Sequence, residues 1–97
     1  MSDKTLLELA AKAAGIDIYF DEDGDCYRVK ESGNRKYWNP ISFDGDALRL
    51  AVKLNLDIEF INGDTLVLNV SEGGGEPCAR TRRAIVRAAA KIGEAMP

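Results

Sequence analysis

Two hydrophobic periods alternate along this chain of 97 residues, and their order limits the folds open to it. Apolar residues recur at helical spacing in 2–15, 44–54 and 78–96, and every second residue in much of 16–38 and 56–70. This order predicts αββαββα, with mostly antiparallel strands in one four-stranded sheet packed with helices. The length suits one domain over residues 1–97, so the expected class is α+β.

Capping residues locate the ends of the first helix. Thr5 and Glu8 have the spacing of a capping box, while Ser2 or Asp3 can cap one turn earlier. Gly15 is expected to take the left-handed conformation that ends the helix.

For the second helix, Asp44 is the expected N-cap and Asp46 lies in the first turn, near the positive end of the helix dipole. Phe43 and Leu48 have the spacing of a hydrophobic staple. Asn55 is expected to end the helix.

The first hairpin begins with alternating apolar residues over 16–20, and the acidic segment 21–25 forms its turn. Calcium loops of the EF-hand type also alternate acids, but their glycine follows the third acid and helices flank them. Here the glycine precedes the third acid, so we expect a plain turn and no metal site. Tyr37 and Trp38 begin a short third strand or an extended approach to the second helix.

The register of the second hairpin is open to two interpretations. A two-residue Asn62-Gly63 turn pairs Phe60 with Thr65, whereas a three-residue loop pairs Phe60 with Leu66. We expect the longer loop, because a slip of one residue inverts the faces of a strand and this register matches apolar residues.

The glycine-rich segment 71–77 is expected to be a flexible loop before the final helix. It lacks both the order of a dinucleotide-binding loop and a P-loop lysine, and its acids would repel an anion.

The amino-acid composition limits the kinds of function that this chain can have. The chain is 45% hydrophobic and 30% charged, as in ordinary globular domains, and its apolar runs are shorter than the ~18 residues of a membrane span. With no signal peptide in view, a cytoplasmic location is expected.

The chain contains no histidine, the commonest general base, so we expect a protein that is not an enzyme and needs no cofactor. A structural zinc site needs four Cys or His ligands, and Cys26 and Cys78 alone cannot supply them. Two free, partly buried thiols are expected, with a disulfide as the alternative.

The final helix carries the clearest charge feature, a stripe of Arg80, Arg83, Arg87 and Lys91. Residues 1–77 hold eight bases and fifteen acids, whereas residues 78–97 hold five bases and one acid. A basic helix on an acidic body can bind nucleic acid or an acidic protein surface. The alternative is a solvated face whose arginines fold back on carboxylates.

The tryptophan lies in the block Trp38-Asn39-Pro40, directly before the second helix. An exposed tryptophan beside a proline can anchor a peptide or stack on a base. A buried one sets the helix on its sheet while Pro40 holds Asn39 extended. We favour the structural role.

Three segments together resemble the phage ABA sandwich domain family: "LLELAAKAAGI", "WNP" followed by "DGDALRLAVKL", and "TRRAIVRAAAKIGEAM". Members are small proteins encoded by phages and prophages of Gram-negative bacteria. The motif of the family maps to Trp38, Asn39, Pro40, Asp46 and Ala47. The resemblance implies an α/β/α-type sandwich and a phage origin, and no particular activity.

These observations lead to a small phage or prophage accessory protein that binds a macromolecule inside the host bacterial cell. A host or phage protein is the expected partner; nucleic acid is less favoured, a membrane is not expected, and a homo-oligomer stays open. One alternative is an inhibitor of bacterial defence that blocks an effector or sequesters a nucleotide signal. The other is a nucleic-acid-binding regulator that uses the basic helix.

Overall fold

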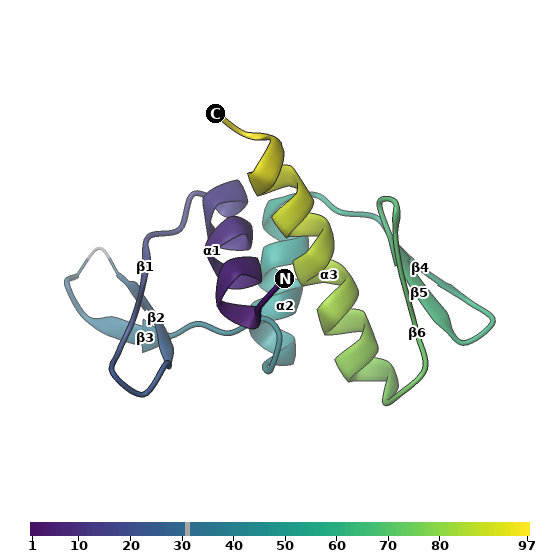
Figure 1. Ribbon diagram of the computed structural model, residues 1–97, viewed down its shortest axis with the longest axis horizontal. Helices are drawn as coiled ribbons and strands as arrows, with labels where there is room; N and C mark the ends of the chain where they lie inside the picture. Colours follow the sequence, from purple (N-terminus) through teal and green to yellow (C-terminus); the bar gives the residue numbers. More distant parts are fainter. Residues whose placement is uncertain (31) are drawn as a thin grey trace.

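The computed structural model describes residues 1–30 and 32–97 and confirms the expected α+β class (Figure 1). In chain order the elements are α1 (Asp3–Ala14), β1 (Ile18–Phe20), β2 (Cys26–Val29), β3 (Arg35–Tyr37), α2 (Asp44–Lys53), β4 (Ile58–Ile61), β5 (Asp64–Val67), β6 (Val70–Gly73) and α3 (Pro77–Ala95).

The strands form two separate three-stranded antiparallel sheets, β1-β2-β3 and β4-β5-β6, so the expected single four-stranded sheet is wrong. The layer order also differs from an α/β/α sandwich, because the helices lie in the middle and the sheets lie on opposite sides of them (Figure 1). Each hairpin gains a third strand from the residues that follow it, and the helices keep the two sheets apart. Local patterns predict hairpins, but they do not say which hairpins share a sheet.

Small residues bring α1 and α3 into close contact at the centre of the molecule. Ala10, Ala11, Ala88 and Ala89 are all buried there. Gly93 lies so close to α1 that a Cβ atom at this position would stand 2.0 Å from the carbonyl oxygen of Leu9. The helix pair therefore depends on the absence of a side chain at this glycine.

The start of α1 is the earlier of the two that the sequence allowed, so Thr5 and Glu8 lie inside the helix and do not form a capping box at its start, whereas its end at Gly15 is as predicted. Ser2 is the N-cap, and its hydroxyl accepts a hydrogen bond from the backbone N–H of Thr5. Gly15 ends the helix with φ 68° and donates its N–H to carbonyls of the last turn.

The start of α2 differs from the prediction. Phe43 occupies the N-cap position without a side-chain cap, while Asp44 lies inside the helix and its carboxylate pairs with Arg82 on α3. The expected staple is not formed as a buried contact, because Phe43 and Leu48 are both exposed. Asn55 has φ 54° just after the helix, the left-handed conformation expected of it.

The Trp38-Asn39-Pro40 block lies between β3 and α2. Trp38 is only 3% exposed, and Pro40 is fully buried. The side-chain oxygen of Asn39 accepts hydrogen bonds from the backbone N–H groups of Ile41 and Ser42, which forms the turn into α2. The block is therefore part of the core and of the turn into α2.

Asp46 connects α2 to this block. It is buried, its Oδ2 accepts the backbone N–H of Asn39 at 3.0 Å, and its Oδ1 pairs with Arg49 at 2.7 Å. The neighbouring Ala47 is buried in the core. Asp46 therefore satisfies a backbone donor that the turn leaves without a strand partner.

The second hairpin has the two-residue turn, so the expectation of a longer loop is wrong. Phe60 pairs with Thr65, and both Asn62 and Gly63 have the positive φ of a tight hairpin turn. The apolar match was misleading because Thr65 is fully buried and its hydroxyl is hydrogen-bonded to that of Thr81 on α3 at 3.0 Å. A threonine whose hydroxyl is hydrogen-bonded can be buried at a position where an aliphatic residue was expected.

The segment expected to be a flexible loop contains part of β6. Val67 pairs directly with Val70 across a second two-residue turn, in which Leu68 has φ 53°. Val70 is buried, and β6 packs with β5 against α3. The loop is therefore limited to the residues between Gly73 and Pro77.

We predict that Gly93→Ala destabilises the fold by about 1–3 kcal/mol or more, because the new methyl group overlaps the Leu9 carbonyl oxygen. Gly45→Ala on α2 is the matched control, since its Cβ would meet only the flexible guanidinium of Arg49. Replacing a helical glycine with alanine there should be neutral or stabilise by up to about 1 kcal/mol. Urea unfolding followed by circular dichroism measures both, and equal midpoints would contradict the close α1–α3 contact.

We predict that Asp46→Ala lowers the free energy of unfolding by about 1–3 kcal/mol, because the Asn39 N–H loses its acceptor. Arg49→Ala removes the ion pair with Asp46 by changing its exposed partner. It should lower the free energy of unfolding by about 0–1 kcal/mol. Urea titration of both variants separates the two contributions. A similar loss in both would show that the ion pair, not the backbone contact, carries the stabilisation.

Candidate functional site

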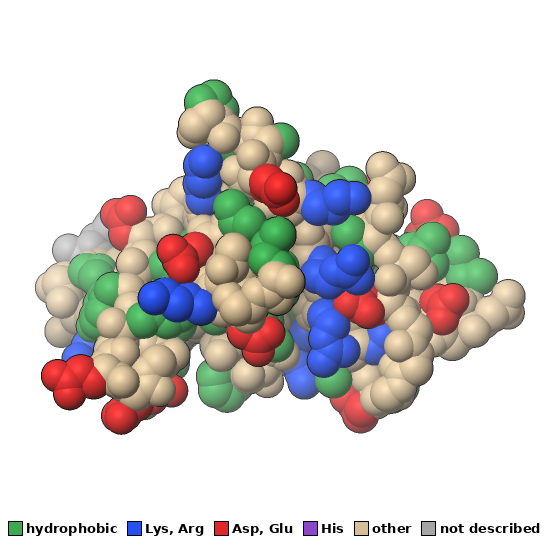
Figure 2. All heavy atoms as spheres, in the orientation of Figure 1, with side chains coloured by type: hydrophobic (Ala, Val, Ile, Leu, Met, Phe, Trp, Pro, Cys, Tyr) green, Lys and Arg blue, Asp and Glu red, His purple; other side chains and the backbone are tan. Residues whose placement is uncertain are grey.

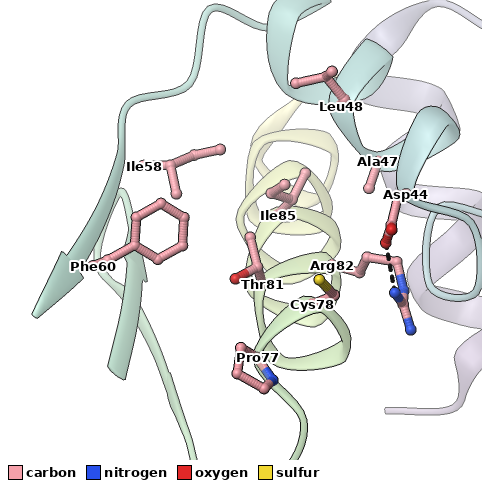
Figure 3. Close-up of a pocket in the computed structure, with 10 residues that line it drawn as sticks. All are labelled: Asp44, Ala47, Leu48, Ile58, Phe60, Pro77, Cys78, Thr81, Arg82 and Ile85. Atoms are coloured by element: carbon pink, nitrogen blue, oxygen red, sulfur yellow. Dashed lines mark hydrogen bonds and ion pairs between the residues drawn. The ribbon is translucent and has the colours of Figure 1, made fainter. Parts of the chain in front are cut away.

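An open apolar groove runs between α2 and β4, with α3 as its floor (Figure 3). Ile58 and Phe60 line it from β4, and Ala47 and Leu48 line it from α2. Ile85 lies at its centre on the floor helix (Figure 3). The volume is about 440 Å³, and the exposed lining is almost wholly apolar.

The groove lies beside β4, one of the two edge strands of its sheet. β5 and the other edge strand, β6, pack on α3, whereas β4 pairs with β5 alone among residues 1–30 and 32–97. The inward side chains of β4 therefore extend past the helix that covers the rest of the sheet. Phe60 is 69% exposed, and Leu48 across the groove is 61% exposed.

Fixed polar contacts border the groove near the start of α3. Arg82 pairs with Asp44 at 2.6 Å and donates from its Nε to the carbonyl oxygen of Ile41, which ties α3 to the start of α2 (Figure 3). The carboxylate of Glu76 caps α3 by accepting the backbone N–H groups of Cys78 and Ala79. The contacts of Arg82 thus connect the floor to the α2 wall, and the Glu76 cap fixes the first turn of the floor helix.

The carboxylates of Glu76 and Asp44 also affect the pKa of Cys78, whose thiol lines this end of the groove. Glu76 and then Asp44 raise the pKa of Cys78 above its ordinary value. Hydrogen bonds from the backbone N–H groups of Cys78 and Ala79 lower the pKa of Glu76, which keeps it ionised at neutral pH. The raised pKa favours the protonated form of this exposed thiol at neutral pH.

The sequence interpretation did not identify this groove. The sequence predicts a staple for Leu48 and a pairing with Leu66 for Phe60, and neither prediction indicates a groove. One signal was present: α2 has apolar residues on two faces, since Leu48 and Val52 lie outside the stripe formed by Ala47 and Leu50. Val52 is 70% exposed, whereas Val86 on α3 is fully buried.

The basic stripe lies on the one side of α3 that the rest of the fold leaves exposed, and Figure 2 shows basic side chains in a column there. Arg87 pairs with Glu72 on β6 at 2.9 Å. Arg80 makes long contacts, 3.5 Å to the hydroxyl of Thr65 and 3.4 Å to the carbonyl oxygen of Gly74. Arg83 and Lys91 are exposed. Two of the four side chains thus contact the body, in the manner of a solvated face.

The acidic turn between β1 and β2 brings three carboxylates together. Oxygens of Asp21, Asp23 and Asp25 lie within 4.8 Å of one another. Oδ1 of Asp21 accepts the backbone N–H groups of the other two, which closes the turn. The cluster thus has a role in the hairpin, and an exposed acidic cluster does not by itself identify a metal site.

Three tyrosines form a row across the first sheet. The ring of Tyr27 stacks on Tyr19 at 5.5 Å and on Tyr37 at 4.6 Å between centroids. Arg35 lies over Tyr27 at 4.9 Å from its ring. Because the rings face one another and Arg35 covers the central one, this row is a cross-strand packing device.

Both cysteines are free, as expected, but their surroundings differ from the expectation of two partly buried thiols. Cys26 is buried, and burial, together with the carboxylates of Asp46 and Glu8, raises its pKa to about 11. Cys78 is exposed at the groove.

Comparisons with protein-family models, with curated proteins and with solved structures found no match for this chain. Among residues 1–30 and 32–97, no helix combines the length and apolar character needed to cross a membrane.

We predict that a thiol reagent such as DTNB modifies Cys78 in the folded protein and Cys26 only after unfolding. Glu76→Gln should speed the reaction of Cys78 at mildly alkaline pH, because losing the nearby negative charge lowers the thiol pKa. Absorbance of the released thiolate measures both rates. Rapid modification of Cys26 in the native state would contradict its burial.

Proposed function

We propose that this chain is a non-enzymatic protein-binding module whose docking surface is the groove between α2 and β4. The observation that carries the proposal is the exposure of Leu48 and Phe60, large apolar side chains that face each other across a preformed hollow. Contiguous exposed apolar surface bordered by polar residues is typical of protein interaction sites. The ion pair of Arg82 with Asp44 supports the proposal because it joins the floor of the groove to the α2 wall before a partner arrives.

A phage or prophage origin is part of this proposal and rests on the sequence resemblance alone. The partner is then a host or phage protein inside the bacterial cell. Inhibition of a defence protein through the groove is one form that such binding can take.

The basic stripe supports a second candidate, in which α3 binds nucleic acid. Exposed Arg83 and Lys91 favour it, whereas the pairing of Arg87 with Glu72 and the acidic body weaken it. Binding through such a surface falls steeply as salt is added, because it depends on the release of counterions from phosphates.

We predict that Leu48→Ser/Phe60→Ser abolishes capture of a protein partner from bacterial lysate, while Arg83→Ala/Lys91→Ala preserves it. Each pair alters two exposed side chains, so both variants should fold, which circular dichroism checks. Once the captured protein is purified, calorimetry should show a loss of at least tenfold in affinity for the groove variant, about 1.4 kcal/mol or more. Loss of the partner from the stripe variant alone would replace the groove with the basic helix as the binding surface.

A further inference from the structure

The charges around the groove are unevenly distributed. The segment 57–64, which forms β4 and its turn, carries Asp57, Glu59 and Asp64 and no basic residue. All three acids are exposed. On the α2 wall, by contrast, Asp44 is paired with Arg82 and Arg49 with Asp46. Asp57 and Glu59 alternate with the groove-lining Ile58 and Phe60, so they lie on the outer face of β4, behind the wall of the groove. The acids of the α2 wall are paired, and this wall also carries the exposed Lys53.

The apolar surface of α2 has the form of a helix-packing ridge. Leu48 and the exposed Val52 are one turn apart on the same face, and such i, i+4 rows are what a second helix packs against. An extended peptide would instead pair with the free edge of β4, but this strand is only four residues long. Pairing along that edge would also leave the ridge of α2 uncovered.

We propose, building on the docking function above, that the groove takes a basic amphipathic helix of a partner protein. Its apolar face packs on Leu48, Phe60 and Ile85, and lysines or arginines on its flank reach around the edge of β4 to the acids of segment 57–64. Long basic side chains can cover apolar surface with their stems while the charged ends stay in water. A second copy of this chain fits less well, because two β4 edges brought together would place like charges side by side.

The test is a selection of short random peptides displayed on yeast against the full chain. Peptides that also bind Leu48→Asp/Phe60→Asp are removed. The proposal expects the remaining peptides to have apolar residues at helical spacing with Lys or Arg beside them, and to become helical on binding. Enrichment of alternating apolar residues, typical of an added strand, would overturn the helix, and enrichment of acidic peptides would overturn the charge preference.

Charge variants test the electrostatic part separately. Asp57→Asn/Glu59→Gln/Asp64→Asn should weaken a selected peptide about tenfold at low salt and reduce the dependence of its affinity on salt. The matched control is Asp17→Asn/Glu22→Gln/Asp23→Asn, which neutralises three acids in and next to the first hairpin, on the opposite side of the helices, and should leave the affinity unchanged. If both variants weaken binding equally, the preference for basic peptides comes from the net charge of the protein. This result would overturn the proposal that the acids of segment 57–64 recognise the peptide.

The outcomes separate this inference from the docking function. If selected peptides depend on the groove but lack the helical basic pattern, the groove remains a docking surface and only the basic helix is rejected. If analytical ultracentrifugation shows dimers that Leu48→Asp/Phe60→Asp dissociates, the occupant is a second copy and the inference is wrong. If no selected peptide depends on the groove, both proposals fail.

Discussion

The close contact of α1 with α3 is the constraint on which the rest of the structure depends. It requires a helix surface of alanines and a glycine, since a single Cβ at Gly93 would overlap the backbone of Leu9. Small residues allow the helices to approach, but they bury little apolar area per residue. Larger side chains therefore complete the core around this contact: Leu50 and Val86 come from the helices, Val67 comes from β5, and Trp38 comes from the segment that follows β3.

The central position of α3 also accounts for its charge pattern. α1, α2 and the second sheet all pack on it, and its exposed charged residues Arg83, Arg87, Lys91 and Glu94 lie along one strip. A helix in this position is expected to gather its charged residues on such a strip. Packing thus accounts for charged residues there without a ligand, whereas it does not account for the exposed Phe60. The position of Phe60 follows from an edge strand that extends beyond the helix beneath it, and this difference makes the groove the stronger candidate.

Local patterns in the sequence predicted the helices and the two hairpins, because caps and apolar periods act over a few residues. Ser2 and Gly15 are examples, since each works within one helical turn. Features that depend on contacts between distant segments were missed. The buried Thr65 is acceptable only because Thr81, sixteen residues away, supplies its hydrogen bond. Likewise, no local pattern shows that Asp44 faces Arg82 instead of capping its helix. The groove belongs to this second kind, because its walls come from α2 and β4 and its floor from α3.

The acids of segment 57–64 serve the fold as well as the proposed recognition. An edge strand with exposed apolar residues such as Phe60 and Ile61 invites pairing with another chain, and proteins counter this with charge and short length. β4 has both features, since it spans four residues and carries Glu59 in its middle. The same negative charge that discourages pairing of two copies favours a positively charged partner. Protection of the free molecule and the proposed selection of a basic partner therefore rest on one charge distribution.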